Sequence, residues 1–251
     1  MRKIGICFWI CLAAFILLPQ PVFAMHIMEG FLPLKWCIIW DVLSLPFIIL
    51  GLMSIQRITK NNPKLKMLIA LAGAFAFVLS ALKLPSITGS SSHPTGVGLG
   101  AILFGPMVMA VLGSIVLLFQ ALLLAHGGLS TLGANLFAMG IVGPISAYVT
   151  YKLLNRFGAK KGYSVFFAAS TGNLLTYITT SFQLALAFQS ATQGFMFLFL
   201  KFLGVFAITQ IPLAISEGLL TVLIFNFLSV YSFNELKELQ ALSEENINEQ
   251  V

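Results

Sequence analysis

Six long apolar stretches constrain the fold more than any other feature of this sequence. They occupy residues 36–56, 67–84, 97–125, 132–154, 163–188 and 197–228. Each could cross the ~30 Å hydrocarbon core of a bilayer as a helix, or could contain a pair of shorter helices. Only 9% of the residues are charged and the mean hydropathy is +0.97, so the chain lacks the charged shell of a soluble protein. The sequence therefore predicts an all-α integral membrane protein.

Residues 1–24 have the pattern of a secretory signal peptide. A basic start precedes an apolar stretch at 4–18, and PQPVFA at 19–24 supplies a helix breaker and small residues. An uncleaved signal anchor is the alternative, but the apolar stretch is short for a ~20-residue span. We expect cleavage after Ala24, which makes Met25 the first residue of the mature chain.

The charges between the apolar stretches predict the topology. Basic residues gather at 57–66 and 152–161, whereas 85–96, 126–131 and 189–196 contain no Lys, Arg, Asp or Glu. The positive-inside rule places the two basic segments in the cytoplasm and places 85–96 and 189–196 outside.

The chain must then cross an odd number of times between the outer segment that ends at residue 96 and the basic segment near 156. Two apolar stretches satisfy this if one of them is re-entrant or if 97–125 forms two short helices. FGP at 104–106 and VGP at 142–144 are places where a helix can break or bend.

Two helices in 97–125 give about seven transmembrane helices after cleavage. The N-terminus is then outside and the C-terminus cytoplasmic. We predict a polytopic domain at 25–230 and an acidic cytoplasmic tail at 231–251, in which residues 234–251 are solvated.

All three histidines of the chain fall on the predicted outer side. A free N-terminus followed by histidine is a chelator, because the Met25 α-amine, the His26 backbone nitrogen and the His26 imidazole can close fused rings on one ion. The amine has a reference pKa near ~8, so a metal can displace its proton at neutral pH. Such all-nitrogen sites suit nickel or copper best and cobalt less readily. His93, in the glycine- and proline-containing loop SSSHPTGVG, is the expected further ligand.

Other interpretations of the histidines stay open at this point. His26 and His93 could be interfacial residues that tolerate water. His126 precedes two glycines, and we expect it to lie at a helix C-terminus, where a positive charge favours the helix dipole, rather than to bind metal.

Several polar residues in apolar surroundings are candidates for supporting roles, because intramembrane carboxylates and amides are costly. Glu29 could orient an imidazole or the terminal amine. Gln120 and Asn135 are expected to brace loops. Glu217 is expected to lie too deep to bind the ion, and to make a structural hydrogen bond or contact a partner.

Four segments of this sequence resemble the CbiM family, the substrate-binding S component of energy-coupling-factor cobalt transporters. They read AMHIMEGFLP at 24–33, GAFAFVLSALKLPSITGSSSHPTGVGLGAILFGP at 73–106, LLFQALLLAHGGLSTLGAN at 117–135 and ITQIPLAISEGLLTVLI at 208–224. The resemblance implies a seven-helix fold in which the processed terminus enters the binding pocket. It also implies that Met25, His26 and His93 ligate the ion. Ser91 and Ser92 precede that loop histidine, and Ser91 replaces a cysteine common in the family.

The same resemblance implies a substrate and partners. The substrate would be cobalt(II), imported for cobalamin biosynthesis, with nickel(II) as the alternative because the related NikM proteins carry it. The partners would be a transmembrane T subunit, a small accessory membrane protein and cytoplasmic ATPases. The chain has no Walker A pattern and so would not power uptake itself.

One apolar helix carries two faces on which small residues recur every four positions. Ala70 and Ala74 form one face, and Ala72 and Ala76 form the other. Such faces allow helices to approach closely. Contact with the T subunit and packing within this chain are both open.

Two other function classes are weaker. An intramembrane hydrolase could use His93 or His126 with a serine, but the chain has no Gly-x-Ser-x-Gly elbow and no pattern that pairs a base with a carboxylate. A secondary carrier would be expected to show internal repeats, and none is evident.

Overall fold

The computed structural model describes residues 26–82, 84–85, 91–190 and 194–239. The predicted signal peptide, its cleavage site and Met25 lie outside these residues, so they remain predictions.

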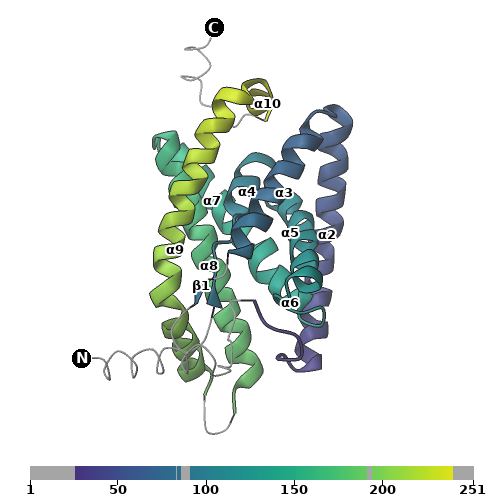
Figure 1. Ribbon diagram of the computed structural model, residues 1–251, viewed down its shortest axis with the longest axis vertical. Helices are drawn as coiled ribbons and strands as arrows, with labels where there is room; N and C mark the ends of the chain where they lie inside the picture. Colours follow the sequence, from purple (N-terminus) through teal and green to yellow (C-terminus); the bar gives the residue numbers. More distant parts are fainter. Residues whose placement is uncertain (1–25, 83, 86–90, 191–193, 240–251) are drawn as a thin grey trace, which may run out of the picture.

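Helices make up nearly all of the described chain (Figure 1). Their bounds are α2 Leu34–Asn61, α3 Leu65–Ala81, α4 Val97–Phe104, α5 Pro106–Leu123, α6 Leu132–Leu136, the π-helix η2 Phe137–Val142, α7 Gly143–Arg156, α8 Lys161–Phe188, α9 Phe195–Tyr231 and α10 Phe233–Glu238. The strands β1, Leu84–Pro85, and β2, Ser91–Ser92, form one short antiparallel pair. The predicted all-α class is confirmed.

The helices form two groups with α4 between them. In Figure 1, α7, α8 and α9 stand together on one side, and α2, α3 and α5 stand together on the other. α4 packs against both groups, and all eight of its residues are buried. The main core therefore surrounds this short central helix.

The outer surface of the bundle is apolar. Large exposed side chains line α2 and α9, including Ile38, Val42, Met53, Leu219 and Leu223. Four helical stretches of the described residues are long and apolar enough to span a membrane: α2, α5, the continuous stretch Leu132–Arg156, and α9. A soluble protein would not expose so much continuous apolar surface, so this is a multi-pass membrane protein.

The stretch 97–125 forms two helices, as predicted from FGP. α4 ends before Gly105, which has a φ of 86°. α5 begins with Pro106 in its first turn, where a backbone N–H would have no acceptor within the helix, so proline is tolerated there. α4 has eight residues and is about 12 Å long, which is too short to span a bilayer alone. At VGP, by contrast, the chain stays helical, and the irregularity is the π-helical segment η2 just before it.

The prediction that residues 234–251 are solvated is wrong at Leu236. Residues 233–238 form α10, and Leu236 is fully buried between the partly buried Phe233 and Leu239. The three apolar residues recur every third position, so they share one helical face that can pack on the bundle. The Asn62 amide also donates a hydrogen bond to the Glu238 carboxylate.

The chain reaches α4 through the loop that carries His93, and this loop packs closely on α3. Gly96, at the N-terminal end of α4, has a φ of 69°. A Cβ added there would lie 2.7 Å from the Ala76 Cα. Both the left-handed backbone and the close approach require glycine at this position.

Replacing Gly96 with alanine should therefore destabilise the protein by about 1–3 kcal/mol, because strain and steric overlap act together. In thermal unfolding of the detergent-solubilised protein, the melting temperature should fall by several degrees. Gly204→Ala is the matched control, since its Cβ would meet nothing within 4 Å in the helix α9. Equal melting temperatures for the two variants would contradict the packing described here.

Candidate metal centre

Three histidines from distant parts of the sequence meet inside the bundle. His26 lies before α2, His93 lies before α4, and His126 lies in the turn after α5. Their exposed fractions are 2%, 0% and 2%, and one ligand nitrogen from each lies within 4.8 Å of the others. The His26 ring stacks on His93 at a centroid distance of 4.4 Å, and His126 meets both rings edge-on. Imidazole nitrogens at this spacing can bind one transition-metal ion.

The neighbours of two rings place them against acceptor atoms. Nδ1 of His93 lies 2.9 Å from the Pro94 carbonyl oxygen, which can only accept a hydrogen bond, so the lone pair of neutral His93 is on Nε2. Nε2 of His26 lies 3.3 Å from the Met139 sulfur, a weak acceptor. The other ring nitrogen of His26, Nδ1, is the one that a chelate through the terminal amine would use.

His126 completes the cluster. Its Nε2 lies 2.7 Å from His26 Nδ1, so one of these two nitrogens donates a hydrogen bond to the other. The predicted helix-end position is also present, because the His126 backbone N–H donates to the Gln120 carbonyl at 3.1 Å. The imidazole, however, lies with the other two rings. This position of the imidazole could not be predicted from the sequence, because a turn fixes the backbone and not the direction of the side chain.

The segment that begins at His26 is held by an amide side chain. Asn135 of α6 accepts a hydrogen bond from the Ile27 N–H at 2.7 Å and donates to the Ile27 carbonyl at 3.0 Å. Thr131 donates to the same carbonyl at 2.6 Å. These bonds satisfy both polar groups of a non-helical residue in a buried position. Asn135 thus braces this segment in the structure, and a supporting role in metal binding stays a prediction.

Glu29 fixes the same segment at its exposed end. Its carboxylate accepts a hydrogen bond from the Ser130 N–H at 3.0 Å, and hydrogen bonds from Ser130 lower the pKa of the Glu29 carboxyl. The two segments touch here, because a Cβ at Gly128 would lie 2.5 Å from the Glu29 Cα. Glu29 therefore joins the terminal segment to the His126 turn. A role in orienting the Met25 amine stays a prediction.

The His93 loop is held mainly by α9. The Ser92 and Thr209 hydroxyls lie 2.7 Å apart, and the Gln210 amide donates to the His93 carbonyl at 3.2 Å. Thr209 and Gln210 were not singled out from the sequence, nor was Met139. A polar pair inside an apolar helix was the available signal for Thr209 and Gln210. Met139 lies in η2, and a π-helical turn is not readable from composition.

Comparison with known proteins agrees with this arrangement. A family model described as "Cobalt uptake substrate-specific transmembrane region", CbiM, matches residues 26–234. This chain belongs to the CbiM family. The cobalt transport protein CbiM of Moorella thermoacetica is 60% identical over 92% of this chain and 89% of its own length. The CbiM proteins of Nostoc sp. and Acetohalobium arabaticum are each 62% identical, over 90% and 92% of this chain and 86% and 92% of their own lengths.

Solved structures show the same fold. A crystal structure of a truncated transition metal transporter superposes with a TM-score of 0.72 at 24% identity, covering 81% of this chain and 97% of that one. A second transition metal transporter gives a TM-score of 0.66, with 81% of this chain and 92% of that one covered. Family membership makes this CbiM protein a transporter component and not an enzyme, which removes the hydrolase alternative.

Asn135→Ala should loosen the terminal segment, because the Ile27 N–H loses its acceptor. Loss of such supporting contacts typically lowers metal affinity by about 10–100-fold, and isothermal titration of the purified protein with cobalt(II) would measure it. Gln120→Ala is the matched control: it removes another buried amide, one that braces α5 to Ser80 of α3 and leaves Ile27 untouched. Similar losses of affinity in both variants would contradict a specific role for Asn135.

Proposed function

We propose that this CbiM protein captures cobalt(II) for an ATP-driven importer and holds it through the processed N-terminus and the histidine cluster. The observation that carries the proposal is the meeting of His26, His93 and His126 in a buried cluster. Buried imidazoles are rare inside an apolar bundle, and three of them with converging nitrogens have few structural reasons to be there. The substrate named for the similar proteins of three organisms is cobalt.

The proposed ligands are the Met25 amine, the His26 backbone and Nδ1 nitrogens, and Nε2 of His93. The geometry of His26 supports this set, because Nδ1 closes the smaller ring with the backbone nitrogen. The same Nδ1 is hydrogen-bonded to His126 Nε2, so an arriving ion would replace the proton between these two nitrogens. His126 is thus either a further ligand or the group that holds the site in shape until the ion binds.

The proposed topology places the site on the outer side of the cell membrane. The basic segments 57–66 and 152–161 would be cytoplasmic, and the turn at 126–131 would be outside. Six crossings would be α2, α3, α5, the stretch Leu132–Arg156, α8 and α9. The seventh would be residues 91–104, which contain α4. The acidic end of the chain would lie in the cytoplasm.

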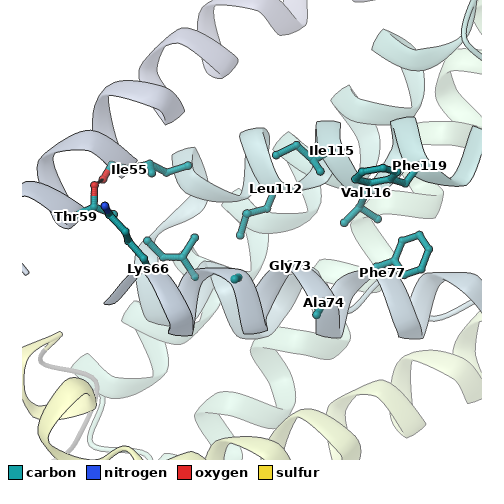
Figure 2. A pocket seen from close by; sticks show the side chains of 12 residues that line it. Ile55, Thr59, Lys66, Gly73, Ala74, Phe77, Leu112, Ile115, Val116 and Phe119 are labelled. Atoms are coloured by element: carbon teal, nitrogen blue, oxygen red, sulfur yellow. Dashed lines mark hydrogen bonds between the residues drawn. The ribbon is translucent and has the colours of Figure 1, made fainter. Parts of the chain in front are cut away.

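The importer would need a membrane T subunit, an accessory membrane protein and ATPases, and a groove on this chain suits the first of these. Side chains of α3, α5 and the end of α2 line the groove (Figure 2). Ala70 and Ala74 line it and are exposed, whereas Ala72 and Ala76 are buried against the rest of the chain. The second pair therefore packs internally, and the first pair is open to a helix of the T subunit.

An added Gly-Pro pair ahead of Met25 in the mature protein should abolish cobalt binding. It converts the Met25 primary amine into an amide, and the proline nitrogen, which has no proton to lose, stops the new terminal amine from completing the chelate. The extended and native forms would be verified by intact mass and titrated with cobalt(II) and nickel(II). Their melting temperatures without metal should agree, which would show that both forms fold. Unchanged cobalt affinity in the extended form would refute the chelate. Tighter binding of nickel than cobalt by the native form would favour nickel as the substrate.

Leucine at both Ala70 and Ala74 should fill the groove and weaken co-purification with the T subunit several-fold or more, while cobalt affinity stays unchanged. Val78→Leu is the control, because Val78 is exposed on the same helix outside the groove. Co-purification equal to that of the native protein would remove this surface from the proposed interface.

A further inference from the structure

Glu217 has a fully buried carboxylate in the middle of α9, and its contacts lead to the metal centre. It accepts hydrogen bonds from the Thr95 N–H at 2.6 Å, the Thr95 hydroxyl at 2.8 Å and the Gly96 N–H at 2.8 Å. It accepts a fourth from the Asn173 amide of α8 at 2.6 Å. Thr95 and Gly96 follow His93 and Pro94 directly in the loop.

These contacts exclude a role as a direct ligand. A carboxylate offers about four lone-pair positions, and four donors occupy them here. A cation would have to displace backbone N–H groups that have no other acceptor beside them. These four donors, three of them at the N-terminal end of α4 and one from α8, allow a carboxylate to be buried in an apolar bundle.

The Glu217 carboxylate is also connected to His93 through two side-chain amides. Asn173 donates to Glu217, and its oxygen accepts a hydrogen bond from the Gln210 amide at 2.7 Å. The Gln210 amide also donates to the His93 carbonyl at 3.2 Å. Glu217 thus fixes the backbone on the C-terminal side of His93 directly, and fixes His93 itself through Asn173 and Gln210. All of these side chains are fully buried.

We infer that Glu217 is a positioning residue for metal capture: it holds the His93 loop so that the His93 imidazole meets the ion. The inference rests on the proposed function and adds to it a residue that connects α9 to His93. In the metal-bound protein, a shift of α9 would move His93 relative to His26, which is held by α6 instead. Glu217 is therefore also the connection through which movement of α9 would change the affinity of the site.

A double-mutant cycle tests the inference. Glu217→Gln places an amide N–H₂ where two donors converge, so the loop should shift and cobalt(II) affinity should fall by about 10–100-fold. In a His93→Ala background, the same change should cost less than about twofold, because its effect acts through His93. The visible absorption spectrum of the cobalt(II) complex of Glu217→Gln should resemble that of His93→Ala. Thr221→Val, which removes a buried hydroxyl bonded within α9, should change neither affinity nor spectrum.

Equal losses of affinity in both backgrounds would overturn the inference, since they would mean a general structural role, and so would unchanged affinity in Glu217→Gln. If Glu217→Gln does not fold, Thr95→Val removes one donor while Thr95→Ser keeps it. Weaker binding in Thr95→Val with recovery in Thr95→Ser supports the inference, and equal binding overturns it. Failure of the proposed function is distinct: the native protein would not bind cobalt, or His93→Ala would bind as well as the native protein.

Discussion

Non-helical backbone can lie inside an apolar helical bundle only if other groups satisfy its N–H and C=O groups. This constraint governs both segments that bring ligands to the centre. Asn135 and Thr131 satisfy Ile27 beside His26, and Glu217 and Gln210 satisfy the loop around His93. Most of the buried polar side chains near the cluster are thus partners of unwound backbone. The metal centre and this polar network are parts of one arrangement.

Each histidine of the cluster is held by a different part of the bundle. His26 is fixed through α6, His93 through α8 and α9, and His126 by the end of α5. The geometry of the cluster therefore depends on how these helices stand relative to one another. A transporter must bind its substrate and then release it, and a site shared among several helices can do both when the helices move.

Much of the architecture follows from the sequence. The apolar stretches predict the helices because length and composition alone decide whether a segment can span a bilayer. Gly105 and Pro106 predict the break between α4 and α5 because backbone chemistry is local. The same locality limits the prediction for the tail, where the spacing of Phe233, Leu236 and Leu239 indicates a packing face only once a neighbouring surface is known.

The candidate site was predictable in part. His26 and His93 stand out through the predicted new terminus and the loop composition. The place of His126 in the cluster, the contact of Met139 and the partners of Glu217 depend on pairings between residues far apart in the chain. No local pattern specifies which donor meets which acceptor over such separations. They become visible only when the bundle is assembled.

His26 and His126 are one hundred residues apart in the sequence, yet their rings touch. An ion bound by groups from such distant segments acts as a cross-link that closes long loops of chain, and loading would stabilise the whole bundle by mass action as well as filling a pocket. Unloading would then loosen the protein as a whole. The bound ion would therefore stabilise the protein that carries it, and this stabilisation would end when the ion is released.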